Sequence, residues 1–279
     1  MGGDGVPGYP QATWRLIIDS EAAGATNMAV DEAILNGVID GTNLPTLRFF
    51  HWSPPCLSLG RNQILAEADL LACRAAGFDV VRRPTGGRSI LHTDELTYSV
   101  SLLKTDPRAA GGIVEGYRRI SEGLLAGLHR LGANAAQATG QKAPGSQSTA
   151  VCFETPSDYE ITVGGRKLVG SAQWRMRGGV LQHGSLPLLG DLARVVDYLA
   201  FPAAEREAQR QRLHNRALTL EEAAGTRYPF ERVARALAQG FAAALNLDLV
   251  PGELSPQERA LAAELRDGRY ADPDWTARL

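Results

Sequence analysis

Two groups of residues in this chain have the types and spacing needed for chemistry, and the first lies in residues 151–184. This stretch begins with a single cysteine, Cys152, and carries Lys167 two residues after the dipeptide Gly164-Gly165. A thiolate is a strong nucleophile, and a neighbouring cation favours the thiolate form and stabilises negative charge that develops on a carbonyl oxygen. A cysteine and a lysine held together therefore indicate acyl transfer through a thioester.

The sequence around Lys167 predicts how the two side chains are brought together. Residues 158–163 alternate between polar and apolar types, two glycines follow, and residues 166–175 lead back. This pattern is typical of a β-hairpin with a two-residue turn. We expect Lys167 to lie just past the turn, close to the segment that carries Cys152. The alternatives are a buried core thiol for Cys152 and a solvated strand lysine for Lys167.

The second group is the loop of residues 82–92, with the sequence RRPTGGRSILH. Adjacent glycines, Gly86 and Gly87, let a backbone approach a ligand closely and direct amide groups at it. Three arginines flank them, and each can engage a phosphate or carboxylate with its planar fork: Arg82, Arg83 and Arg88. The spacing is neither a P-loop nor a dinucleotide fingerprint. The loop therefore predicts an anion site, and the alternative is a simple turn with solvated arginines.

Two histidines near these groups are ambiguous from sequence. His92 ends the glycine loop, and His183 lies near the end of the stretch that begins with Cys152. Histidine can act as a general base or orient a neighbouring group, but a lone histidine beside a loop more often has a structural role. We expect both to be structural.

Composition limits the class of protein. The chain has 279 residues, of which 44% are hydrophobic and 22% charged, as in ordinary globular proteins. A formal net charge of -2 gives no indication of a nucleic-acid or membrane partner, and no apolar run has the roughly 20 residues needed to span a bilayer. The first residues show no secretory signal, and three cysteines without metal spacing suit a reducing compartment. We therefore expect a cytoplasmic protein, with monomer as the default state.

Hydrophobic patterns divide the chain into strands followed by helices. Strand patterns lie at 14–19, 47–51, 57–59, 78–82, 96–103 and, near the end, 247–250. Helical patterns lie from Thr26 or Asn27 to Val38 and at 66–76, 113–131, 193–199, 205–215, 230–245 and 256–265. Cys73 falls on the second helix and is interpreted as a core residue. We expect a flexible lead over residues 1–12, an α/β core over 13–190 and a helical part over 191–279 packed on the same domain.

Several motifs resemble the biotin/lipoate protein ligase superfamily, and within it the LipM-type octanoyltransferases. They are RRPTGGRSILHTDELTYSV, VCFETPSDYEITVGGRKLVGSAQWRMRGGVLQHGSLPL, the helix NMAVDEAIL and the segment RYADPDW. The resemblance covers roughly residues 13 to 277 and implies a mixed β-sheet flanked by helices. Lipoate ligases of the superfamily usually have a third glycine where this chain has Arg88. They also need no cysteine at the position of Cys152.

The resemblance implies roles for individual residues. Cys152 would be the nucleophile that takes an octanoyl group from acyl carrier protein, and Lys167 would support it. The acceptor would be the target lysine of a lipoyl domain, such as the H protein of the glycine cleavage system, in a reaction without ATP, metal or another cofactor. Substrate contacts are expected from both groups of residues: Arg82, Arg83, Gly86, Gly87, Arg88, His92, Gly170, Ser171 and His183. Two alternatives are an ATP-dependent lipoate or biotin ligase and a non-catalytic carrier-binding protein.

Overall fold

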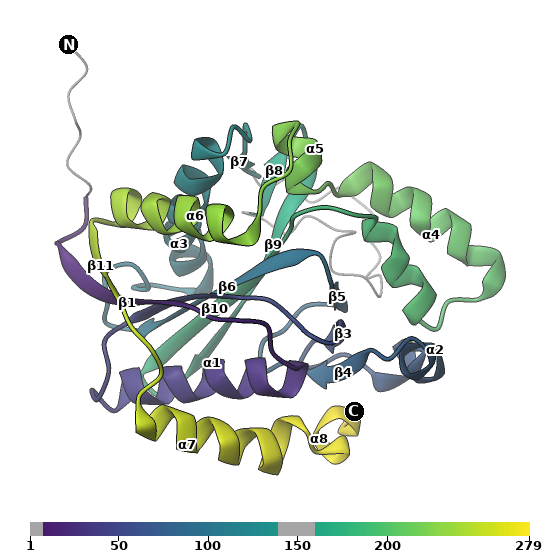
Figure 1. The fold of residues 1–279 in the computed structure, drawn as a ribbon, viewed down its shortest axis with the longest axis horizontal. Coiled ribbons are helices and arrows are strands. Elements are labelled where there is room, and N and C mark those ends of the chain that lie inside the picture. The colour runs from purple at the N-terminus through teal and green to yellow at the C-terminus, as the bar shows by residue number, and fades with distance from the viewer. Residues whose placement is uncertain (1–7, 139–159) are drawn as a thin grey trace.

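The computed structural model describes residues 8–138 and 160–279. Within them, one large mixed sheet is the centre of the molecule (Figure 1). Its eight strands run in the spatial order β11-β1-β2-β6-β10-β9-β8-β7. Their bounds are β1 Ala12–Ile18, β2 Thr46–Phe50, β6 Glu95–Leu103, β7 Ala136–Gln137, β8 Ile161–Val163, β9 Arg166–Met176, β10 Gly179–Pro187 and β11 Leu247–Pro251. The mixed α/β fold expected from the sequence is confirmed.

The sheet is parallel at one edge and antiparallel elsewhere. Strand β1 pairs in parallel with both β2 and β11, whereas β2, β6, β10, β9, β8 and β7 form successive antiparallel pairs. The last strand, β11, comes from the mainly helical C-terminal part of the chain. It forms one edge of the sheet, next to β1. The hydrogen bonds between β11 and β1 therefore join the C-terminal part of the chain to the large sheet.

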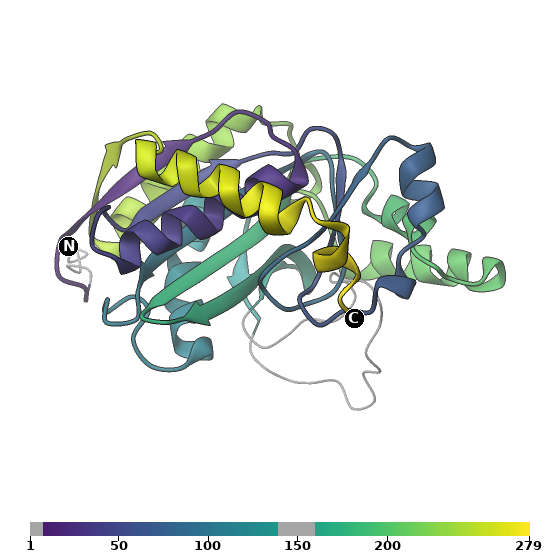
Figure 2. The same ribbon diagram turned by 90° about the horizontal axis from the view of Figure 1, so that it is seen from below.

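Helices cover both faces of the sheet. On one face α3 (Ile113–Arg130) and α6 (Phe230–Leu245) pack together over a core that includes Trp14, Phe49 and Tyr98. On the other face α1 (Gly24–Ile39) lies on the sheet and α7 (Pro256–Leu265) lies on α1 (Figures 1 and 2). Burial of apolar surface on both faces is the main source of stability for such a layered fold.

A small sheet lies beside the large one and carries the glycine loop. Its order is β4-β3-β5, with β3 parallel to β4 and antiparallel to β5. Its strands and the helices around it are β3 Cys56–Leu59, β4 Asp79–Arg82, β5 Ile90–His92, α2 Leu70–Ala75, α4 Ala203–Arg216 and the 3-10 helices η1 Leu65–Glu67 and η2 Leu192–Tyr198. The remaining short helices are α5 Leu220–Ala224, the π-helical turn η3 Arg266–Tyr270 and α8 Pro273–Ala277.

The structure corrects details of two predicted helices. The helix α1 begins at Gly24 after Ala23, and Asn27 does not cap it but donates from its buried amide to the carbonyls of Ala22 and His51. The predicted helix over residues 66–76 is a 3-10 turn followed by a shorter α-helix. Cys73 is buried in the core of the small sheet, as predicted. The predicted flexible lead falls largely on residues outside the described part.

Candidate active site

The β8–β9 hairpin places Lys167 on the sheet. Gly164 and Gly165 form its two-residue turn with φ angles of +56° and +80°, which glycine adopts without strain, so the predicted hairpin is confirmed. Thr162 pairs with Lys167 but Ile161 pairs with Val169, so β9 carries one extra residue at this point. Such bulges change the direction of a side chain relative to regular alternation.

Lys167 is not solvated, and the alternative of a surface lysine is wrong. Its side chain is fully buried, and its Nζ lies 2.6 Å from Oε1 of Glu160, whose side chain is 5% exposed. An ammonium group and a carboxylate removed from water need such a partner, because an isolated buried charge is strongly destabilising. The hairpin therefore holds a fixed positive charge below the surface. Cys152 lies outside the described residues, so its proximity to Lys167 stays a prediction.

In the glycine loop, Arg82 is committed to the protein's own backbone. Its guanidinium is fully buried and donates to the carbonyls of Gly60 at 2.8 Å, Gln63 at 2.6 Å and Thr276 at 2.7 Å. Trp275 donates in return to the Arg82 carbonyl at 2.9 Å. Arg82 thus fastens the last helix and the chain after β3 to the strand that precedes the loop. Any effect it has on a substrate is indirect, through the position of the loop.

Arg83 shapes the glycine turn itself. Its Nη2 donates to the carbonyls of Gly86 and Arg88, both at 2.8 Å, and holds the two sides of the turn together. Gly87 has a φ of +95°, and its carbonyl approaches Gly60 so closely that a Cβ there would lie 2.0 Å away. The backbone geometry therefore requires glycine at positions 60 and 87. Because Arg82 and Arg83 are buried, the alternative of a turn with solvated arginines is wrong for these two.

Arg88 differs from the other two arginines. Its side chain is 32% exposed and forms an ion pair of 3.3 Å with Glu67. Gln63 donates to the same carboxylate at 2.8 Å and to Ser89 at 2.7 Å. The Arg88 side chain therefore pairs with η1.

His92 is part of a buried chain of polar groups. Its Nδ1 lies 2.7 Å from Oε1 of Glu95, and its Nε2 lies 2.8 Å from Oγ of Ser58. The order Ser-His-Glu resembles a hydrolase triad, but Ser58 is fully buried and accepts a hydrogen bond from Arg83 at 3.0 Å. An inaccessible hydroxyl cannot act as a nucleophile. The chain therefore fixes the histidine ring, which also stacks on Trp52 with a centroid distance of 3.9 Å.

His183 forms a second buried pair, with Asp31 of α1. The Nδ1 atom lies 3.3 Å from Oδ2 of Asp31, and the Nε2 atom lies 2.6 Å from Oγ1 of Thr85 in the glycine loop. Burial lowers the pKa of His183 and outweighs the opposing effect of Asp31, so the ring favours its neutral form. For Asp31, burial acts to raise the pKa, but the His183 hydrogen bond and the charge of Arg48 hold that pKa below its usual range. An ionised aspartate and a neutral histidine thus tie the loop to the central sheet.

These groups line a pocket with an empty volume of about 370 Å³ when the space open to solvent is included. It is called the acyl pocket here for the role proposed for it below. Five of the predicted substrate-contact residues line it: Arg83, His92, Gly170, Ser171 and His183. Apolar walls come from Met28, Trp52 and Ile90. Arg82, Gly86, Gly87 and Arg88 do not line it. The geometry thus brings His92, His183 and the β9 backbone to one cavity. Whether these residues contact a substrate stays a prediction.

Comparison with known proteins places the chain in a family. Residues 23–242 match the family described as "Lipoyl protein ligase A/B catalytic domain". The chain belongs to the lipoyl protein ligase A/B family. Three relatives called "Octanoyltransferase LipM", from Kyrpidia tusciae, Moorella thermoacetica and Bacillus subtilis, are 44%, 45% and 38% identical. These alignments cover 94–96% of this chain and 97–99% of each relative. The resemblance predicted from the motifs is confirmed.

Solved structures of the family share the fold. A bi-partite lipoate protein ligase from Thermoplasma acidophilum aligns with a TM-score of 0.80 at 23% identity, over 96% of this chain and 97% of that one. A lipoate-protein ligase A bound with ATP aligns with a TM-score of 0.77 at 24% identity, over 95% and 99% of the two chains. These likenesses support the biotin/lipoate ligase catalytic fold expected from the sequence.

Four residues of this candidate site were not predicted from the sequence: Asp31, Trp52, Glu95 and Glu160. Glu160 lies two residues before Thr162, the cross-strand partner of Lys167, so the hairpin register contained a signal for it. Asp31, Trp52 and Glu95 gave no comparable signal, because their neighbours in space are distant in the chain or belong to a turn. In the described residues, no cluster of three or more His, Cys, Asp or Glu side chains is arranged to hold a metal ion. No helix there is long and apolar enough to cross a membrane.

Proposed function

We propose that this protein transfers an octanoyl group from octanoyl-acyl carrier protein to the target lysine of a lipoyl domain, through a thioester on Cys152. The observation that carries the proposal is the near full-length similarity to octanoyltransferases of the LipM type. The buried Lys167, at the position of the family's lysine motif, supports it. The acceptor we favour is the H protein of the glycine cleavage system, and the compartment is the cytoplasm.

The reaction takes place in two balanced steps. The Cys152 thiolate attacks the thioester carbonyl, a new C–S bond forms, and the bond to the phosphopantetheine sulfur breaks, which releases a thiol after protonation. The neutral amine of the acceptor lysine then attacks the acyl-enzyme, an amide C–N bond forms, and the C–S bond to Cys152 breaks and returns the thiolate. The proton that the amine loses balances the one taken up by the pantetheine sulfur. The first step exchanges one thioester for another and the second is downhill, so no ATP is consumed.

Lys167 supplies the positive charge in this scheme. An ammonium group held in a low-dielectric site favours the thiolate and stabilises the oxyanion that forms on the attacked carbonyl. Glu160 positions the ammonium by the 2.6 Å contact. The octanoyl chain occupies the acyl pocket against Met28, Trp52 and Ile90, where burial of its methylene groups contributes to binding.

Intact-mass measurement tests the intermediate. Octanoyl-acyl carrier protein, mixed with the protein in the absence of an acceptor, should add one octanoyl group that hydroxylamine removes. The adduct should be absent from Cys152→Ala and present on Cys73→Ala, a control that removes a buried thiol. An equal adduct on Cys152→Ala, or none on the parent, contradicts the mechanism. Transfer to a lipoyl domain with and without ATP separates the transferase from a ligase and from a non-catalytic carrier-binding protein.

A further inference from the structure

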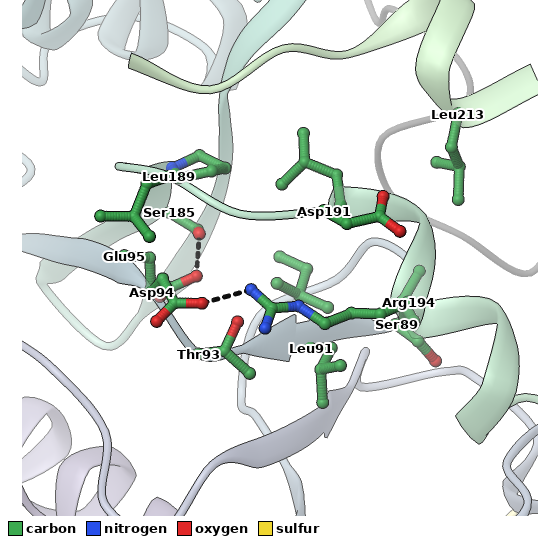
Figure 3. Close-up of a pocket in the computed structure, with 14 residues that line it drawn as sticks. Ser89, Leu91, Thr93, Asp94, Glu95, Ser185, Leu189, Asp191, Arg194 and Leu213 are labelled. Carbon is green, nitrogen blue, oxygen red and sulfur yellow. Dashed lines mark hydrogen bonds and ion pairs between the residues drawn. The ribbon is translucent and has the colours of Figure 1, made fainter. Parts of the chain in front are cut away.

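A second cavity lies beside the acyl pocket, between the end of the large sheet and η2 (Figure 3). Its empty volume is about 460 Å³ when the space open to solvent is included. We propose that it binds the neutral, amide-bearing arm through which a thioester donor carries its acyl chain. This inference rests on the proposed function and assigns the two halves of the donor to two cavities.

The two cavities share a single partition. Ile90 and Ser185 line both of them. In the partition, Ser185 donates to Oε2 of Glu95, whose Oε1 contacts His92 of the acyl pocket (Figure 3). A donor whose acyl chain lies in the first pocket therefore has the second cavity immediately next to it.

The lining of the second cavity suits a chain that alternates methylene and amide groups. Three leucines from three segments supply apolar surface: Leu189, Leu192 and Leu213. Hydroxyl groups of Ser89 and Thr93 supply hydrogen-bonding partners. At the rim, Arg194 reaches from η2 to the carboxylate of Asp94 (Figure 3). Pockets with mainly apolar walls and a few placed polar groups are typical of sites for such ligands.

The charges of the cavity argue for a neutral occupant. Three carboxylates line it, those of Asp94, Glu95 and Asp191, against one guanidinium, that of Arg194. The arginine is already paired with Asp94, and His214 lies 2.9 Å from Asp191 on the outer side. A nucleotide triphosphate would bring several negative charges to this excess of carboxylates, and like charges at an interface disfavour binding. An amide arm brings none.

Two small donors test the assignment without a carrier protein. Octanoyl-pantetheine has the whole arm, and octanoyl-N-acetylcysteamine ends after the first amide. For the parent protein we expect kcat/KM for acylation to be about tenfold higher with octanoyl-pantetheine, equivalent to about 1.4 kcal/mol of binding. Thr93→Trp, which fills the cavity from its half-buried rim, should lower kcat/KM more for octanoyl-pantetheine than for octanoyl-N-acetylcysteamine and so remove this advantage. Leu192→Trp fills the cavity from η2 and should behave alike.

The control is Leu103→Trp, at the far end of β6 and partly exposed, which should leave both rates within twofold. Equal losses with both donors, or no loss with either in two folded variants, overturn the inference. Equal kcat/KM for the two donors on the parent also overturns it, and so does ATP binding that Thr93→Trp abolishes. A parent that neither donor acylates overturns the proposed function itself, a result distinct from all of these.

Discussion

The glycine loop and the β8–β9 hairpin both bury positive charge, but they neutralise it differently. In the loop, both guanidinium groups donate to backbone carbonyls. Arg83 donates on the two sides of the turn, and Arg82 donates to the chain after β3. In the hairpin, the ammonium of Lys167 faces the carboxylate of Glu160. A planar guanidinium can bridge several fixed acceptors, whereas an ammonium is a compact charge on a flexible stem.

This difference indicates a division of labour. The loop arginines act as parts of the backbone framework, so their removal should affect folding first. The hairpin lysine forms a buried ion pair and, in the proposed mechanism, contributes charge to the reaction, so its removal should affect both rate and folding. Five experiments can break or sharpen the contrast.

The largest effect is expected from Lys167→Met. Acyl-enzyme formation should slow by a factor on the order of 10² or more, the usual cost of losing a charge directed at an oxyanion. The free energy of unfolding should also fall by about 3–5 kcal/mol, because Glu160 is left buried without its cation. Intact-mass measurements on samples quenched at successive times give the acylation rate, and urea unfolding gives the free energy of unfolding.

A double variant separates the two effects of Lys167. Lys167→Met combined with Glu160→Leu should recover most of the lost stability, since neither charge then remains buried, but should recover none of the rate. Lys104→Met serves as the matched control at an exposed contact. A single variant with a rate within a few-fold of the parent would show that the lysine has only a structural role.

Arg82→Met should be the next largest change, and it should appear in stability. Three carbonyls lose their donor, and an unsatisfied buried acceptor costs about 1–3 kcal/mol, so we expect a loss of about 3 kcal/mol or more. The acylation rate of the folded fraction should change far less than in Lys167→Met. Arg88→Met, which removes a partly exposed arginine, is the control and should cost less than about 1 kcal/mol. A rate loss without a stability loss in Arg82→Met would reverse the proposed division.

His183→Gln should change the pH dependence of stability by a smaller amount. The folded protein holds the pKa of His183 below its ordinary value of 6.5, so the unfolded chain binds the extra proton first. Stability from this residue is therefore complete above about pH 6.5 and falls as the pH decreases below it. Between pH 7.5 and 5.5 the parent should lose about 1 kcal/mol more than His183→Gln in urea unfolding. Parallel curves for the two proteins would place His183 outside the buried network.

The smallest effect is expected from Arg88→Gly. Its ion pair with Glu67 is partly exposed, and such pairs contribute about 0–1 kcal/mol. Neither the parent nor this variant should bind ATP measurably by calorimetry, and neither should acylate a lipoyl domain from free octanoate in a gel-shift assay. Such a result would show that a glycine at position 88 is not sufficient to give the protein ligase activity. Ligation from the free acid at a rate comparable to transfer from acyl carrier protein would overturn the transferase assignment.

Local pattern was enough to predict much of this protein. Alternation and the Gly164-Gly165 turn predicted the β8–β9 hairpin, and 3.6-residue periodicity predicted α6 and α7 with their observed bounds. The motifs around the glycine loop and Lys167 predicted the family that the comparisons confirm. These features depend on residues close together in the chain, where sequence spacing maps directly onto geometry.

Tertiary structure alone decided how the charged residues are used. An arginine in a glycine loop is suited equally to a ligand phosphate and to a backbone carbonyl. Arg82 donates to backbone carbonyls because the fold places Gly60 and Thr276, which are distant in sequence, next to its guanidinium. The Asp31–His183 pair likewise joins residues 152 positions apart. Burial and long-range partners determine the charge state and role of a polar side chain, and neither is encoded in its local spacing.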